Sequence, residues 1–243
     1  MFTKIIGFMA GPLGVVLNFL YGFIQNYGIT LLVFTLIVKF CLYPLYAKQI
    51  KSTVRMSELQ PKMKALQAQY ANDRQKLNEK TMELYKKEKF NPAGGCLPAL
   101  IQMPIILGLF TLLRNPMMYI QGNEMLIATH ESFLWIPDLS QPDPWILPVA
   151  AGITTYISFV QTQAQNAGMS DTNAAMASMM KMMKYFFPVM ILVMGRSFPA
   201  SLTIYWFFGQ AVQIGFNVHL GRVKKKLRAE SERKAENERR RER

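Results

Sequence analysis

Residues 28–47 read GITLLVFTLIVKFCLYPLYA, an apolar stretch in which Lys39 is the one charged side chain. A helix needs roughly 20 mostly apolar residues to cross the hydrocarbon core of a bilayer, which is about 30 Å thick. We therefore predict a membrane-spanning helix over residues 28–47. Apolar residues make up 51% of the 243 residues and are concentrated in stretches of this kind, which favours an all-α integral membrane protein.

Four more stretches are apolar enough to cross a membrane, and the last two form a hairpin. The five predicted spans are residues 28–47, 94–115, 145–163, 183–198 and 199–220.

The distribution of basic residues predicts which loops are cytoplasmic. Of the 28 Lys and Arg residues, eleven lie within residues 48–93 and eleven within residues 221–243, whereas residues 116–144 contain none. Cytoplasmic segments of membrane proteins carry an excess of Lys and Arg. We expect residues 48–93, 164–182 and 221–243 to be cytoplasmic and residues 116–144 to be extracytoplasmic.

The N-terminal segment, residues 1–27, is apolar and admits three interpretations. A cleaved signal peptide would need a basic start and a small-residue cleavage site, and neither is convincing. A sixth span would also fit the topology. We favour an interfacial helix over residues 12–25 that lies flat in the membrane surface. Its expected lipid-facing residues are Leu13, Val16, Leu17, Leu20 and Ile24.

The polar segment 48–93 is rich in strong helix formers and predicts a hairpin of two cytoplasmic helices. The break is expected at Asn72-Asp73, because Asn and Asp cap helix N-termini. Pro61 should bend the first helix or mark a local restart. A seam between the two helices is expected from Leu59, Met63, Leu66, Tyr70, Leu77, Met82, Leu84 and Tyr85. The hairpin is either a docking arm for a partner or a solvated element that only fixes topology.

The tail, residues 221–243, mixes blocks of cations with glutamates and cannot bury a core. It either contacts anionic lipid or ribosomal RNA or simply anchors the topology.

Lys39 is the candidate functional residue, because a charge near the centre of a span is costly, roughly 2.5 to 3.5 kcal/mol. No Asp or Glu lies in any predicted span. A salt bridge is therefore disfavoured, and a hydrated cavity with neutral polar walls is expected. The alternative is that Lys39 snorkels to the cytoplasmic interface. The candidate wall residues are Thr35, Gln102, Thr154, Thr155, Ser158, Gln161, Thr203, Gln210 and Gln213.

Sites for metals and enzymatic chemistry are not evident in the sequence. His130 and His219 have no carboxylate or thiol at ligand spacing, and there is no P-loop and no Ser/His/Asp arrangement. We expect no enzyme activity, no cofactor and no small-molecule substrate. A transporter or channel would predict an internal repeat and a carboxylate within a span, and neither is found. A membrane-anchored RNA-binding scaffold would leave Lys39 unexplained.

Several motifs, in a specific order, resemble those of the YidC membrane insertase family, which also includes the mitochondrial Oxa and chloroplast Alb proteins. They are NYG (26–28), YPL (43–45) after the span with the cation, LQPKM (59–63), NPAGGCLPALIQMP (91–104), FLWIPDLSQPDPWILP (133–148) and FPASLTIYWF (198–207). The resemblance covers residues 26–221.

The resemblance implies five spans that enclose a hydrophilic groove in a bacterial cell membrane, open to the cytoplasm and to lipid and closed to the outside. Lys39 would attract a short acidic tail of an incoming protein, whose apolar span would slide out along the third and fifth spans. Thr35, Gln102, Tyr205 and Trp206 match groove or slide positions. The partners implied are nascent membrane proteins, the ribosome or a targeting factor at the hairpin and tail, and the Sec translocon.

One departure from the family concerns the cation itself, because many relatives carry arginine where this chain has Lys39. Lysine keeps the positive charge but lacks the planar, forked guanidinium group. Unlike arginine, lysine can lose its proton when it is desolvated. The groove should therefore need good hydration to keep this lysine charged.

Overall fold

The computed structural model describes residues 2–91, 97–114, 116–119, 123–165 and 174–241, and this part of the chain is helical apart from its loops and one isolated bridge, between Phe133 and Ile136. The helices are α1 (Phe2–Ile24), α2 (Tyr27–Gln69), α3 (Arg74–Lys87), α4 (Leu97–Arg114), α5 (Pro116–Tyr119), α6 (Asn123–Ala128), α7 (Ile146–Gln165), α9 (Ala174–Gly195) and α10 (Ala200–Arg241). The expectation of an all-helical protein is confirmed for these residues.

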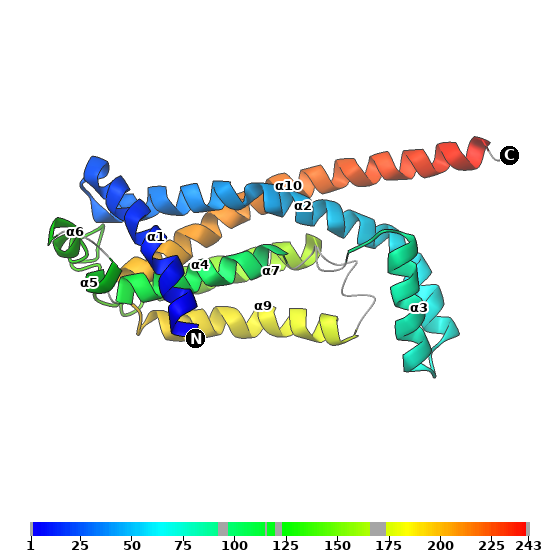
Figure 1. The fold of residues 1–243 in the computed structure, drawn as a ribbon, viewed down its shortest axis with the longest axis horizontal. Helices are drawn as coiled ribbons and strands as arrows, with labels where there is room; N and C mark the ends of the chain where they lie inside the picture. Colours follow the sequence, from blue (N-terminus) through cyan, green and yellow to red (C-terminus); the bar gives the residue numbers. More distant parts are fainter. Residues whose placement is uncertain (1, 92–96, 115, 120–122, 166–173, 242–243) are drawn as a thin grey trace.

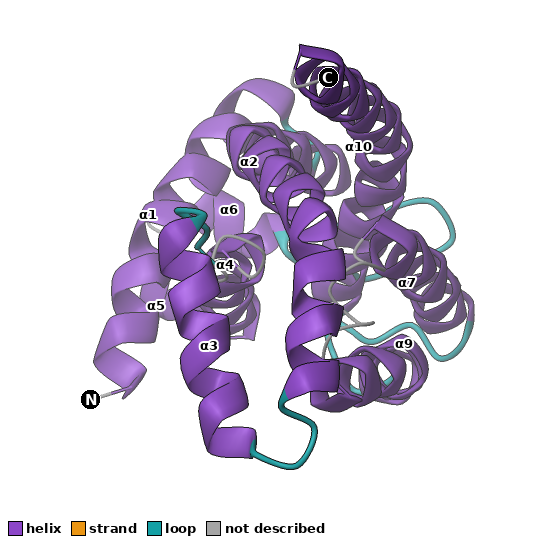
Figure 2. Cartoon of the chain, turned by 90° about the vertical axis from the view of Figure 1, so that its right-hand side faces the viewer, coloured by secondary structure: helices purple, strands orange, loops and turns teal. Residues whose placement is uncertain are grey.

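Helices α2, α4, α7, α9 and α10 run along the long axis of the molecule, with α1 set obliquely across one end (Figure 1). Helix α10 packs on α7 and α2, α7 packs on α9, and α1 packs on α4 and α2. Figure 2, a view along the long axis, shows α7, α9 and α10 on one side and α1 and α4 on the other. We call the end with α5 and α6 the loop end and the end with α3 the hairpin end.

Helix α2 begins at an Asn26 cap, whose side chain accepts a hydrogen bond from the Ile29 backbone N–H at 2.9 Å. It includes the predicted span 28–47 and continues unbroken through Pro44 and Pro61 as the first helix of the hairpin. Figure 1 shows α2 curving toward α3 over its second half, which fits a proline within the helix. Among the described helices, α2 is the one that is long and apolar enough to cross a membrane by length and composition.

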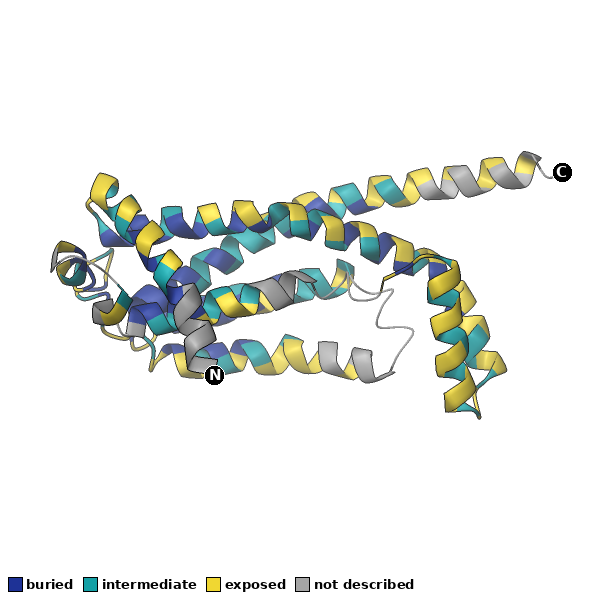
Figure 3. Cartoon of the chain, in the orientation of Figure 1, coloured by how far each residue is buried: buried dark blue, intermediate teal, exposed yellow. Residues whose placement is uncertain are grey.

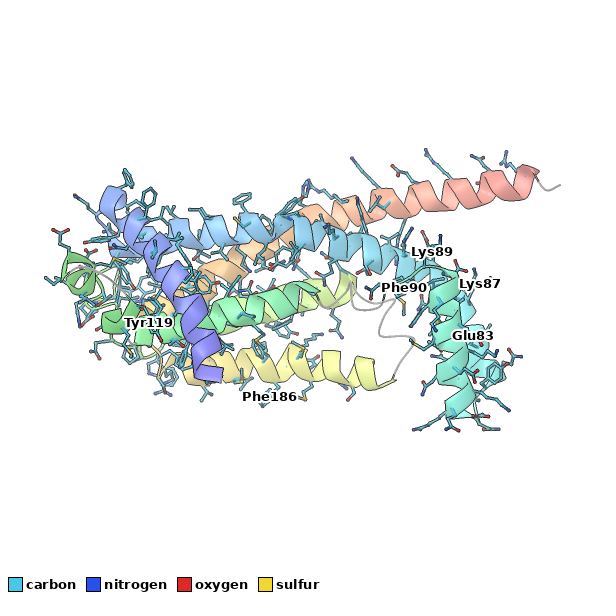
Figure 4. All side chains as sticks on the ribbon, in the orientation of Figure 1. Glu83, Lys87, Lys89, Phe90, Tyr119 and Phe186 are labelled. Carbon is cyan, nitrogen blue, oxygen red and sulfur yellow. The ribbon has the colours of Figure 1, made fainter. Side chains whose placement is uncertain are left out.

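The hairpin break is confirmed at Asp73, whose carboxylate accepts a hydrogen bond from the Lys76 backbone N–H at 3.0 Å. Leu59 and Met63 are buried, as the predicted seam requires. The prediction that Met82 contributes to the seam is wrong, since Met82 is 55% exposed. No side chain of α3 is fully buried. The hairpin is mostly exposed in Figure 3, and its charged side chains, including Glu83 and Lys87, are visible in Figure 4.

Helix α1 spans residues 2–24 and turns its predicted face toward protein rather than lipid. Leu17 is fully buried, and Leu13 and Leu20 pack against the core. Val16 is exposed as predicted, together with Val15, Phe19 and Phe23, which were not in the predicted set. The expected orientation is therefore wrong for Leu13, Leu17 and Leu20, because both faces of α1 are apolar and packing on α4 selects one of them.

The main apolar core lies at the loop end and joins α1, α2, α4, α6, α7 and α10. A carboxylate oxygen of Glu131 accepts a hydrogen bond from the Tyr21 hydroxyl at 2.5 Å, and its other oxygen accepts one from the Tyr27 N–H at 2.7 Å. The Phe133 ring lies directly against Gly28, where a Cβ atom would come within 2.1 Å of the ring. The glycine of the NYG motif is therefore required by this close approach.

Arg196, for which the sequence predicts no role, lies at the loop end, with its guanidinium group 4.0 Å from the centre of the Trp145 ring. The predicted tail continues α10 as a helix to Arg241, with exposed side chains along most of its described length. Arg228 of this helix donates a hydrogen bond to the Ser57 hydroxyl at 2.7 Å, which ties the start of the tail to α2.

Candidate functional site: a cavity around Lys39

A cavity of about 550 Å³ lies between α2, α4, α7, α9 and α10. Its volume is within the range of roughly 300 to 1,000 Å³ that is usual for small-molecule sites. Its polar lining residues come from α2, α4, α7 and α10 and are Lys39, Tyr46, Gln49, Gln102, Ser158, Thr162, Gln165, Thr203, Tyr205, Trp206, Gln210, Gln213 and Asn217.

The opposite wall is apolar and is built mainly by α4 and α9. It includes Met103, Leu107, Phe187, Met190 and Met194. Met103 is 56% exposed and Met194 is 39% exposed although both line the cavity. The cavity therefore opens to the outside of the bundle along these helices. Phe186, the next residue to Phe187 on α9, is exposed and faces away from the bundle in Figure 4.

Lys39 is 6% exposed, and its ammonium group lines the cavity. Its stem lies across Gly209 of α10, where a Cβ atom would be 3.4 Å from Lys39 Cε. The ammonium donates a hydrogen bond to Gln213 Oε1 at 3.3 Å and lies 5.9 Å from the centre of the Tyr46 ring. None of the ion pairs among the described residues involves Lys39.

This geometry separates the two interpretations of Lys39. A snorkelling lysine would extend its ammonium group to the end of the span, whereas Lys39 is buried against α10 and hydrogen-bonded to a neutral amide. The structure therefore agrees with a neutral polar wall around a cation that has no carboxylate partner among the described residues.

Most of the predicted wall residues do meet around the cavity. Those that line it are Lys39, Gln102, Ser158, Thr203, Tyr205, Trp206, Gln210 and Gln213. Gln102 donates a hydrogen bond to the Tyr205 hydroxyl at 3.3 Å, which joins α4 to α10. Their role in binding a substrate stays a prediction.

Four predicted residues do not line this cavity. Thr35 is fully buried, and its hydroxyl donates to the Leu31 carbonyl. Thr155 lies behind the wall, where it accepts a hydrogen bond from Trp206 Nε1 at 3.0 Å. Thr154 bonds to carbonyls of its own helix, and Gln161 also lies off the wall. Hydroxyl side chains can satisfy their hydrogen bonds within the helix, so they do not have to face a polar cavity.

Five polar residues of the wall were not predicted: Tyr46, Gln49, Thr162, Gln165 and Asn217. The sequence could have indicated Asn217 as a wall residue. It follows Gln213 by four residues in a mostly apolar stretch of α10 and therefore lies on the same helix face. Thr162 follows Ser158 at the same spacing on α7.

The chain is similar to known protein families and solved structures. The family model described as 60Kd inner membrane protein matches residues 19–227. A protein named membrane protein insertase YidC from Fusobacterium nucleatum is 40% identical over 203 residues, which cover 83% of this chain and 89% of that relative. The chain belongs to the YidC insertase family.

Other YidC relatives differ in length from this chain. The one from Oceanobacillus iheyensis is 40% identical, over 79% of this chain and 73% of its own length. The one from Aeromonas hydrophila is 39% identical, over 85% of this chain but only 35% of its own length.

A solved structure supports the same assignment. It is described as an active YidC insertase with the first transmembrane domain resolved, and it matches with a TM-score of 0.56 and 27% identity. The match covers 86% of this chain and 45% of the solved chain. The predicted family, its helical fold and its class, a membrane insertase rather than an enzyme, are confirmed. Motif NPAGGCLPALIQMP is described only in part, because residues 92–96 lie outside the described residues.

Proposed function

We propose that this chain inserts newly made membrane proteins into the bacterial cell membrane by drawing a short acidic tail of the substrate to Lys39 and releasing the apolar span to lipid. The observation that carries the proposal is the buried Lys39 ammonium at the wall of the cavity, which has an amide but no carboxylate among its described partners.

The electrostatic argument rests on the cost of an unpaired charge. Neutral hydrogen bonds offset only part of the cost of removing an ammonium group from water. A substrate carboxylate that enters the cavity would offset more of it, and the charged pair would be stronger there than in bulk water. A neutral or basic tail would gain nothing from Lys39.

The apolar surfaces near the cavity suit the other half of the substrate. Methionine side chains such as Met103 and Met190 adapt to apolar partners of different shapes. The outward side of α7 exposes Ile153, Tyr156 and Ile157. We propose that the substrate span leaves the cavity through the opening between α4 and α9 and moves into lipid along α7 and α10.

The proposal retains five membrane spans at residues 28–47, 94–115, 145–163, 183–198 and 199–220, with the hairpin and the tail in the cytoplasm. Polar wall residues such as Gln102, Ser158 and Gln213 lower the hydropathy of helices other than α2. Since these side chains face a cavity, they do not prevent their helices from crossing a bilayer. The part of the 164–182 loop at residues 166–173 lies outside the described residues.

The basic hairpin and tail are the proposed contacts for the ribosome, a targeting factor and anionic lipid, and the Sec translocon is a further proposed partner. The two segments together contain 22 of the 28 basic residues, and most described side chains of both are exposed. RNA and anionic lipid both attract such clusters.

The test uses Lys39→Ala, Lys39→Arg and Lys39→Glu in cells depleted of their native insertase, with translocation of a short acidic tail as the measurement. We expect Lys39→Arg to retain activity and the other two to lose it, Glu more than Ala. Lys181→Ala is the matched control, because Lys181 is an exposed cation of α9 that does not line the cavity. Full activity of the Glu variant would refute the attraction mechanism.

A further inference from the structure

A buried amide on α10, Asn217, is joined to Lys39 through one intermediate side chain. Asn217 is 5% exposed and lines the cavity. Its side-chain oxygen accepts a hydrogen bond from Gln213 Nε2 at 3.1 Å, and Gln213 Oε1 accepts the bond from the Lys39 ammonium. The three side chains therefore form a directed chain of hydrogen bonds.

The orientation of the Asn217 amide is fixed by α7. Its Nδ2 donates to the Ser158 carbonyl oxygen at 3.4 Å and to Thr162 Oγ1 at 3.2 Å. An asparagine side chain has two N–H donors on nitrogen and acceptors only on oxygen. With both donors used on α7, the oxygen of Asn217 is the atom that faces Gln213.

This orientation determines which end of the Gln213 amide faces Lys39. The Asn217 oxygen requires a donor, so the nitrogen of Gln213 points toward Asn217 and its oxygen points toward the ammonium. The reversed amide would place N–H groups against the Lys39 ammonium and two oxygens against each other. Both contacts are repulsive, and in a buried site their cost is higher than in water.

We propose that Asn217 is a positioning residue that sets the charge preference of the groove by holding Gln213 with its oxygen toward Lys39. The ammonium then has an acceptor on the protein side and keeps its remaining N–H groups for a substrate carboxylate. This inference rests on the proposed function, because it assigns Asn217 a role in the selection of acidic tails by Lys39.

The position of the Asn217 backbone does not depend on its side chain. Gln165 Nε2 donates to the Asn217 carbonyl oxygen at 2.7 Å, and Lys224 donates to the Gln165 carbonyl oxygen. These bonds join α7 to α10 without involving the Asn217 side chain, so its replacement does not remove them. A variant at Asn217 therefore removes the amide while leaving the contact between the helices.

The experiment compares the insertion of two substrates that differ only in their short tail, one acidic and one with the corresponding amides. The measured quantity is the ratio of the two insertion yields in cells depleted of their native insertase. We expect Asn217→Leu to lower this ratio about 3- to 10-fold, the effect of losing one neutral side-chain hydrogen bond, the one between Gln213 and Asn217. Val218→Ala, an exposed neighbour on α10, is the control and should leave the ratio unchanged.

Thr162→Val tests the same chain of hydrogen bonds from the α7 side. It replaces Asn217→Leu as the test of the positioning role if that variant does not accumulate in cells. It removes one acceptor of Asn217 and should lower the ratio in the same direction, whereas Thr162→Ser keeps a hydroxyl group and should restore it. An equal loss for both substrates would show that Asn217 is only structural and would overturn the proposal.

Lys39→Gln distinguishes this inference from the proposed function. If Lys39→Gln lowers the ratio and Asn217→Leu does not, the positioning role is refuted while the function stands. If Lys39→Gln leaves the ratio unchanged, the attraction mechanism itself is refuted.

Discussion

Replacing Gln213 by Glu tests whether Lys39 acts through a free positive charge. The substitution is nearly isosteric and places a carboxylate where the amide oxygen now lies, 3.3 Å from the Lys39 ammonium. At an effective dielectric constant of about 20, two unit charges at this distance attract each other by about 5 kcal/mol. An internal carboxylate would therefore occupy the ammonium before any substrate arrives.

The net effect will be smaller than this Coulomb energy, because the new carboxylate also loses hydration and places an oxygen against Asn217 Oδ1, where Gln213 now donates an N–H. If only about 1.4 kcal/mol of the Coulomb energy remained, a little more than a quarter, the insertion of an acidic tail relative to an amide tail would still fall about tenfold. We expect Gln213→Glu to lower insertion of an acidic-tail substrate at least about tenfold and to change that of an amide-tail substrate by less than about twofold.

The assay measures the fraction of the substrate tail that becomes accessible to protease added outside the depleted cells, with matched acidic and amide tails. Gln213→Met is the control for size, because it removes the acceptor without adding a charge and should have a smaller effect. If Gln213→Glu inserts the acidic tail as well as the unmodified protein while Lys39→Glu does not, the reasoning from a free charge is wrong.

Three further results are expected. Gly28→Ala should destabilise the protein by about 1 to 3 kcal/mol in thermal unfolding in detergent, because the added methyl group collides with the Phe133 ring; an unchanged midpoint would contradict this packing. Trp206→Phe should cost about 0.5 to 1.5 kcal/mol in the same assay through loss of its 3.0 Å hydrogen bond to Thr155, and a Thr155→Val variant should not add to that loss. The hydrogen bond from Lys62 lowers the pKa of Glu88 below 4.5, so the contribution of this bond to hairpin stability is present above pH 4.5 and is lost as the pH falls through the lowered pKa. Hydrogen exchange in α3 should show this opening in acid, and Glu88→Gln should abolish the pH dependence of the exchange.

Polar side chains of the spans differ in how well the sequence predicts their position. Gln102, Gln210 and Gln213 were expected on the cavity wall and line it. Thr35 and Thr154 were expected there too, but their hydroxyl groups bond to carbonyls one turn back. A threonine can satisfy its hydroxyl group within its own helix. The difference is not a strict rule, because Thr203 lines the cavity and Gln161 does not.

The helical class, the hairpin break at Asp73, the cation Lys39 within its span and the family could all be predicted before the fold was known, because they depend on hydropathy, capping and motif order along the chain. Tertiary structure decided which face of α1 packs on α4 and which residues meet Lys39. Helix rotation is set by packing between helices, and a pattern within one helix cannot report it. The bonds from Lys39 through Gln213 and Asn217 to Thr162 join α2, α10 and α7, so only the assembled fold could reveal them.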